Sequence, residues 1–174
     1  AKTNDPKYIR NRVILSMLWD TGARNGELLS LNIQDLDMDR RRALIRTEKA
    51  KSRRPFREIF WTADTHGNLL QWLKKRENLQ RKSQFKNPDA LFISVANGLS
   101  GQRFTIRGVG EMLRRYSVKA KVPYLNAHSF CHRVGHHIIK SGGSSADVMN
   151  ILGHSSVQST TIYTMMSDHE LEKR

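Results

Sequence analysis

The stretch NAHSFCHRVGHHIIKSGGSSADVMNILGHSSVQSTTIYT, residues 126–164, decides which fold and which chemistry this chain can support. It places His128 and His154 in defined settings, and Tyr163 follows the second histidine by nine residues. Small and hydroxyl-bearing side chains crowd around the tyrosine at positions 155, 156 and 159–161, where a packed helix would carry apolar ones. This pattern indicates a phenol held in a polar segment, outside a hydrophobic core.

Apolar residues recur at helical spacing through the same stretch, which predicts three short helices. The first covers about 127–140 and stops at the Ser-Gly-Gly of 141–143. Ser144 or Ser145 can cap the second, which has Asp147 in its first turn and ends at Gly153. The third carries Tyr163. The apolar residues expected to face inward in the first two helices are Phe130, Val134, Ile138, Val148, Ile151 and Leu152, and the third helix also carries Val157 and Ile162.

The totals describe one domain with a hydrophobic core. The chain has 174 residues, of which 38% are apolar and 26% charged. No run approaches the roughly 20 apolar residues that a membrane span needs, and no signal peptide opens the sequence. One cysteine excludes an intrachain disulfide framework and a multi-cysteine metal site. A reducing compartment is therefore the default expectation.

Net charge is the strongest global signal. Thirty Lys and Arg stand against sixteen Asp and Glu, which gives +14 at pH 7. Solubility needs only a modest imbalance of either sign, so this excess predicts a polyanionic partner. Nucleic acid is the simplest such partner, and an anionic membrane surface is the alternative.

Upstream, the spacing predicts a helix over 8–19 that begins at Asp5-Pro6 and stops at Thr21-Gly22. A short helix over 24–31 follows, and two later helices span 64–80 and 104–120. Alternation predicts strands over 43–47 and 56–60, joined by a cation-rich loop, and 90–94 reads as a short buried segment. The inward residues expected in these helices are Ile9, Val13, Ile14, Met17, Leu18, Leu28, Leu31, Leu69, Leu70, Trp72, Leu73, Ile106, Val109, Leu113 and Tyr116.

Two segments together resemble the tyrosine recombinases, also called the phage-integrase family. Residues 21–28, TGARNGEL, match the family's Thr-Gly-x-Arg-x-x-Glu-Leu skeleton, with Arg24 as its first arginine. The family's C-terminal pattern is His-x-x-Arg, then Leu-Gly-His, then a tyrosine about nine residues on. This chain supplies His128, the Leu-Gly-His of 152–154 and Tyr163. The second arginine, three residues after the first histidine, is replaced by Cys131.

The resemblance implies an α+β fold, mainly helical, with a small antiparallel sheet from 42 to 60 and possible participation of 90–94. Family members usually carry an N-terminal helical DNA-clamping domain before this point. We therefore expect residues 1–174 to form the catalytic domain alone. The resemblance also implies a homotetramer on double-stranded DNA, with a monomer as the alternative for the isolated domain, without membrane association, in the cytoplasm at the nucleoid.

The implied chemistry is cleavage and rejoining of DNA through a 3′-phosphotyrosyl link, without metal or cofactor. Tyr163 would attack, Arg24 would clamp the phosphate oxygens, and His128 and His154 would contact the phosphate and handle protons. Lys49, or alternatively Lys51, would protonate the leaving oxygen. Further DNA contacts are expected from Lys51, Arg53, Arg54, Arg107 and Arg133.

Cys131, where the family pattern has an arginine, is the departure with the largest consequence for the expected chemistry. On a helix His128, Cys131 and His132 share one face, whereas Arg133 lies about 140° away from it. A thiol carries no fixed positive charge, and losing one preorganised donor commonly costs about 10²–10³ in rate. We therefore expect slow cleavage.

Two other functions remain open, namely a non-catalytic DNA-binding protein on the same fold and a topoisomerase-like nicking-closing enzyme. His132, His136 and His137 also have spacing compatible with zinc, but packing or phosphate contact explains them more simply.

Overall fold

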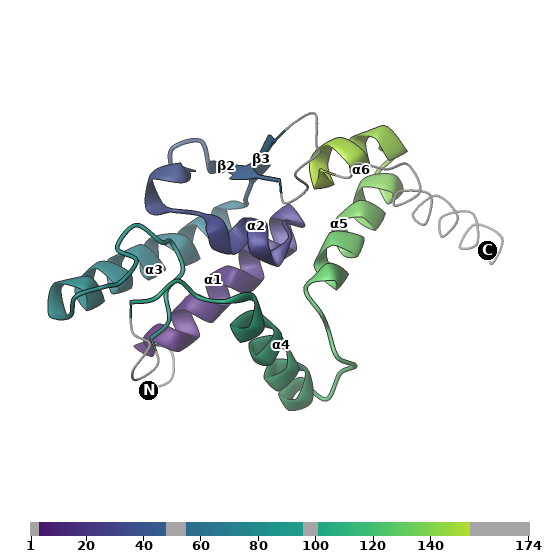
Figure 1. Cartoon of the computed structure of the whole chain (residues 1–174). Helices are drawn as coiled ribbons and strands as arrows, with labels where there is room; N and C mark the ends of the chain where they lie inside the picture. Colours follow the sequence, from purple (N-terminus) through teal and green to yellow (C-terminus); the bar gives the residue numbers. More distant parts are fainter. Residues whose placement is uncertain (1–3, 48–54, 96–100, 154–174) are drawn as a thin grey trace.

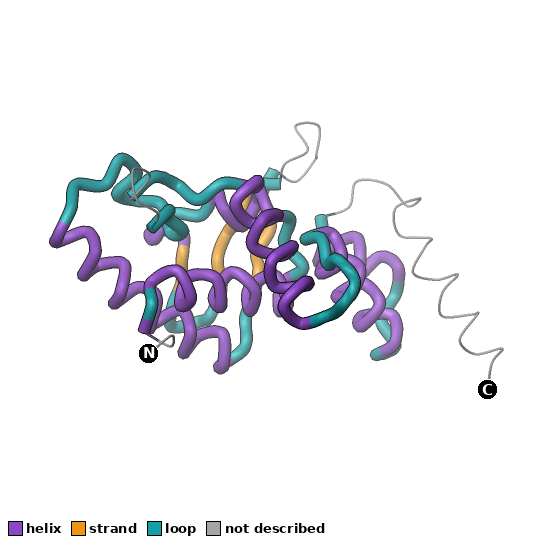
Figure 2. The backbone as a smooth tube through the Cα atoms, turned by 90° about the horizontal axis from the view of Figure 1, so that it is seen from below, coloured by secondary structure: helices purple, strands orange, loops and turns teal. Residues whose placement is uncertain are grey.

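The computed structural model describes residues 4–47, 55–95 and 101–153. Helices dominate, and a small antiparallel sheet lies among them (Figures 1 and 2), which confirms the expected fold class. In chain order the elements are α1 (Pro6–Thr21), α2 (Asn25–Ser30), the 3-10 helix η2 (Ile33–Asp35), β1 (Leu36–Asp37), β2 (Arg42–Arg46), β3 (Phe56–Phe60), α3 (Ala63–Lys82), α4 (Ile106–Ala120), α5 (His128–Lys140) and α6 (Ser145–Leu152).

Helix α1 is the central element and contacts α3, β3 and α5. The Asp5 side chain caps its first turn by accepting from the Lys7 N–H at 2.8 Å, and Pro6 opens the helix as predicted. It ends at Gly22, whose φ of 59° is the left-handed conformation that glycine tolerates best. The sharp stop turns the chain directly into α2.

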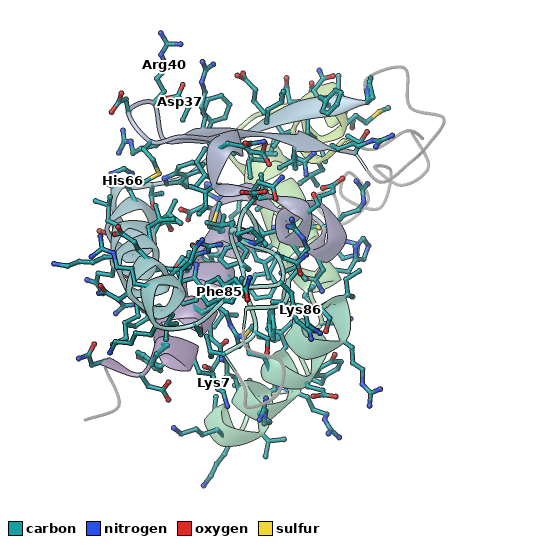
Figure 3. All side chains as sticks on the ribbon, turned by 60° about the vertical axis from the view of Figure 1, so that its left-hand side comes forward. Lys7, Asp37, Arg40, His66, Phe85 and Lys86 are labelled. Carbon is teal, nitrogen blue, oxygen red and sulfur yellow. The ribbon has the colours of Figure 1, made fainter. Side chains whose placement is uncertain are left out.

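The sheet has the order β1-β2-β3, with both pairs antiparallel. Ala43 pairs with Ile59, and both are buried, whereas Leu44 and Arg46 are exposed. This confirms the alternation predicted for the two longer strands. Figure 3 shows Arg40 at the outer edge, near Asp37, in the turn between β1 and β2.

Helix α3 packs along α1 (Figure 1) and buries Leu69 and Trp72. The expectation for Leu70 was wrong, because its side chain is 51% exposed. The packed stripe of this helix continues to Arg76, which is 1% exposed and donates from Nε to the Ala90 carbonyl at 2.9 Å. A guanidinium with carbonyl partners thus extends the packed stripe of an amphipathic helix, which apolar side chains usually form.

Residues 90–94 are buried as predicted, but they do not add a strand to the sheet. Among the residues that the structure describes, they form two isolated bridges, Asn32 to Ala90 and Ile93 to Arg103. Backbone groups on either side satisfy part of the segment, since the Leu91 N–H donates to the Leu31 carbonyl at 2.9 Å and the Phe104 N–H donates to the Phe92 carbonyl at 2.8 Å. The Trp72 indole adds a bond from α3 to the Leu91 carbonyl at 2.9 Å. The segment is therefore a buried connector held by neighbouring backbone and by α3.

Helix α4 begins at the Thr105 cap and buries Val109 and Leu113, as predicted. Ile106 was expected on the same side, but in the first turn it is 56% exposed. The Asn11 side chain donates to the Tyr116 hydroxyl at 3.0 Å and so ties α4 to α1.

Helices α5 and α6 form a pair on the right of Figure 1, away from α3. Ser144 caps α6 and accepts from the Asp147 N–H at 3.2 Å, which settles the choice between Ser144 and Ser145. Gly153, with φ of 64°, ends the helix as predicted. Ile151 was placed inward wrongly, because it is 45% exposed.

Two separate groups of buried apolar side chains result. The larger core joins α1–α4, the sheet, residues 90–93 and Phe130 of α5. The smaller core consists of Val134, Val148 and Leu152, between α5 and α6. Gly22 lies against the smaller core, since a Cβ there would be 2.7 Å from Leu152 Cδ2. The segment around Arg24 therefore lies where the two cores meet.

Candidate active site where the two cores meet

Arg24 stands at the start of α2, two residues after the glycine that ends α1. Its Nη1 donates to Glu27 Oε1 at 2.7 Å, and its backbone N–H donates to Glu27 Oε2 at 3.0 Å. Its Nη2 lies 3.4 Å from the Gly153 carbonyl oxygen, at the end of α6. The Arg-x-x-Glu spacing places both side chains on one turn, so the carboxylate fixes the guanidinium.

Arg57 reaches the same carboxylate from β3. Its Nη2 donates to Glu27 Oε2 at 2.8 Å, and its Nη1 donates to the Ile151 carbonyl at 2.5 Å. Its Nε is buried and has no hydrogen-bond partner among the residues that the structure describes. We call Arg24, Glu27 and Arg57 the arginine cluster. It links α2, β3 and the end of α6.

Sequence reasoning did not single out Arg57, which was included only as part of the strand predicted over 56–60. A signal was available, because Arg57 is two residues from the buried Ile59 and therefore points to the same face of β3. An arginine on the inward face of a strand needs an acceptor.

Glu27 is ionised in this setting. Its side chain is fully buried, and burial pushes the pKa upward. The charge of Arg57, the backbone N–H of Arg24 and the charge of Arg24 outweigh this effect, so the pKa of Glu27 lies below its usual value. One carboxylate therefore forms ion pairs with two guanidinium groups.

His128 opens α5 beside this cluster. Its ring meets that of His132 edge to face, with centroids 4.4 Å apart, which confirms that the two histidines share a helix face. Burial, then His132 and Arg24, lower the pKa of His128 below the ordinary histidine value. The imidazole is thus uncharged at neutral pH and able to accept a proton.

Cys131 lies one turn further along α5 and is only 3% exposed. Its thiol donates to the Gly22 carbonyl, with Sγ 2.9 Å from the oxygen. Burial is the main cause that raises the pKa of Cys131, and Arg24, Glu27 and Arg57 also act on it. An uncharged thiol therefore lies close enough to all three residues of the arginine cluster to interact with them electrostatically.

The structure thus brings together Arg24, His128 and Cys131 of the predicted site. Arg107 is instead exposed on α4, where it pairs with Glu111 at 3.1 Å. The guanidinium carbon Cζ of Arg133 lies 3.5 Å from the centroid of the Trp19 ring. The other predicted residues, Lys49, Lys51, Arg53, Arg54, His154 and Tyr163, lie outside the described residues.

Within residues 4–47, 55–95 and 101–153, no three His, Cys, Asp or Glu side chains are grouped so that they could hold a metal ion. None of the helices in this described part has the length and apolar character that a bilayer crossing requires.

A sequence profile described as "Phage integrase family" matches residues 1–170. The chain is 33% identical over 172 residues to "Tyrosine recombinase XerC" of Corynebacterium glutamicum, covering 98% of this chain and 51% of that protein. It is 28% identical over 177 residues to "Tyrosine recombinase XerD" of Mycobacterium tuberculosis, with 98% and 52% covered. The chain therefore spans about half the length of the curated relatives it matches.

Solved structures agree with these relatives. XerA recombinase superposes with a TM-score of 0.74 at 28% identity, covering 95% of this chain and 56% of that one. The XerH site-specific recombinase in a post-cleavage complex with a palindromic difH substrate gives 0.77 at 25% identity, with 97% and 45% covered.

Proposed function

Because this chain belongs to the phage integrase family, we propose that it cleaves and rejoins double-stranded DNA at a specific site through Tyr163. The arginine cluster carries the proposal. It presents two guanidinium groups on one buried carboxylate, beside an uncharged imidazole. Such forks match the shape and charge of phosphate oxygens.

In the proposed step the Tyr163 oxygen bonds to phosphorus, and the bond between phosphorus and the 5′ oxygen breaks. A free phenol has a pKa near 10, so it needs a base, for which His154 and His128 are the candidates. The departing 5′ oxygen takes a proton from Lys49 or Lys51. Arg24 stabilises the extra charge that develops on the non-bridging oxygens. The bond energy stays in the phosphotyrosine, so rejoining needs no ATP.

Cys131 determines the rate of DNA cleavage that we expect. A neutral thiol cannot supply the charge of the arginine that the family pattern has there, and one lost donor costs up to about 10²–10³ in rate. The same residue favours a second candidate, a DNA-binding protein that retains the fold without cleavage.

The DNA partner is supported by the net charge of +14 and by the exposed Arg107. Lys51, Arg53 and Arg54 are proposed as further contacts from the loop between β2 and β3. Assembly as a tetramer on two duplexes belongs to the same proposal.

The test uses nicked duplexes of randomised sequence, so that the short strand beyond the cleavage point diffuses away and traps any covalent product. We expect a protein–DNA adduct that survives denaturing electrophoresis, disappears in Tyr163→Phe and persists in the control Tyr124→Phe. Sequencing the trapped strands identifies the substrate.

Binding of the duplex without adduct would favour the non-catalytic alternative. Relaxation of supercoiled plasmid without joining of two sites would favour a nicking-closing enzyme.

A further inference from the structure

The arginine cluster holds more positive than negative charge. The Glu27 side chain is fully buried, and the Arg57 and Arg24 side chains are 8% and 19% exposed. Among the described residues no other carboxylate pairs with either guanidinium. Two cations on one anion leave about one unit of buried charge, which is costly unless an anion joins them. The cluster is therefore suited to receive a further anionic group.

Arg57 has donors to spare for such an anion. A guanidinium has five N–H bonds, and the Glu27 and Ile151 contacts occupy one on each Nη. The buried Nε has no partner within residues 4–47, 55–95 and 101–153. Gly153 lies against this atom, since a Cβ at that position would be 3.1 Å from it. A larger residue at 153 would crowd the space that Nε faces.

Position 131 lies close to the same arginine cluster. Cys131 contacts the Gly22 carbonyl, immediately before the segment that carries Arg24. Its electrostatic neighbours are Arg24, Glu27 and Arg57. A side chain that is longer than cysteine would reach the place where the two guanidinium groups already meet.

We propose that Arg57 supplies the second guanidinium of the phosphate cradle, donating to a non-bridging oxygen of the scissile phosphate in place of the arginine that the family pattern has at 131. The proposal rests on the proposed function and adds a catalytic residue to it. Arg57 recovers part of the charge that Cys131 lacks. Restoring arginine at 131 therefore accelerates the unsubstituted chain only modestly, by about tenfold, which is less than the full value of one donor.

The first test measures single-turnover cleavage of the duplex recovered from the randomised pool. Arg57→Gln should slow cleavage about 10²-fold or more. The control Arg42→Gln, in an exposed pair with Asp37 and Glu58 on the same sheet, should change it by about twofold at most. Adding Cys131→Arg to Arg57→Gln should restore about tenfold or more, since the second guanidinium returns from another element.

A neutral linkage separates charge stabilisation from structural support. With a methylphosphonate at the cleavage position, Arg57→Gln should cost less than about tenfold, because less negative charge develops there. Equal losses on both linkages, no recovery with Cys131→Arg, or an equal loss in Arg42→Gln would overturn the proposal.

Arg57→Lys covers the case in which Arg57→Gln fails to fold. It retains the charge and should lose less than about 10²-fold in rate relative to the unsubstituted chain, and a larger loss in folded Arg57→Lys protein would count against a charge-based role.

The second test does not need cleavage. Inorganic phosphate is titrated into the unsubstituted chain while the Nε–H resonance of Arg57 is followed by NMR. A saturable shift supports the anion site, and a resonance that does not move overturns it. If the unsubstituted chain forms no covalent adduct, the proposed function fails, and this titration still decides the role of Arg57.

Discussion

The larger and the smaller core of this protein are held in different ways. The larger core packs helices from both halves of the chain against a sheet, and Trp72 and Phe92 are completely buried in it. In the described part of the chain, the smaller core contains three buried side chains, between α5 and α6. Helix α6 is fastened to the larger part through Arg24 and Arg57, which donate to its last carbonyl groups.

This difference explains how the site is built. The larger core positions Arg24, Glu27 and Arg57, whereas α5 brings His128 and Cys131. The two arginines that we assign to phosphate also tie down the end of α6, the segment that leads to His154. Binding of phosphate and placement of the terminal segment are therefore expected to depend on each other.

Removing the shared carboxylate should have the largest effect on this junction. Glu27→Gln leaves two guanidinium groups without an anion in a buried place, which should cost about 3–5 kcal/mol in the free energy of unfolding. Glu58→Gln, in the exposed pair with Arg42, is the control and should cost about 0–1 kcal/mol. Urea denaturation measures both. Equal costs would show that the cluster does not hold the two regions together.

Truncating the smaller core should come next. Leu152→Ala removes one of its three buried side chains and should cost about 2–3 kcal/mol. Hydrogen exchange should show faster opening of α6 while the amides of α1 and α3 keep their protection. Leu70→Ala, at an exposed leucine of α3, should change stability by less than about 0.5 kcal/mol. Uniform loss of protection after Leu152→Ala would mean that the two cores unfold as one unit.

The turn between α1 and Arg24 gives a smaller effect. Gly22→Ala forces a left-handed residue to carry a Cβ, at about 1–2 kcal/mol, and moves Leu152 away. Gly67→Ala is the opposite case, because no atom of the described residues lies within 4 Å of a Cβ added there in α3. It should stabilise the chain by about 0.5–1 kcal/mol. Thermal unfolding compares the two, and a neutral Gly22→Ala would contradict the close contact between the cores.

The smallest effect concerns pH. The pKa of His128 is depressed, so near pH 6 the folded state binds fewer protons than the unfolded chain. The corresponding stability is present above about pH 6.5 and is lost as the pH falls through the folded pKa of His128. NMR titration should give a midpoint below the ordinary histidine value, and His132→Gln should raise it. A midpoint at or above that value would remove the case for an uncharged imidazole beside Arg24.

Much of the fold could be predicted from local patterns. Apolar spacing located the helices, alternation located β2 and β3, and Asp5, Ser144 and Gly153 marked helix ends. It was harder to predict which face of each helix is buried. Leu70 and Ile151 adjoin buried residues on an amphipathic helix, and spacing alone cannot tell which edge of the apolar stripe meets a neighbour.

The candidate site was predictable where a motif held it within one turn, as for Arg24 with Glu27 or His128 with His132. Arg57 was not, because its partners are a carboxylate 30 residues away and a carbonyl 94 residues away. Such contacts depend on how β3 and α6 pack, and a basic sequence context concealed a buried arginine among solvated ones.

Mass spectrometry of the trapped adduct tests the central claim most directly. After protease and nuclease digestion, the peptide that contains Tyr163 should carry one nucleotide through its 3′ phosphate, attached to the phenolic oxygen. A nucleotide on any other residue, or an unmodified Tyr163 peptide from protein that has cut DNA, would contradict the account.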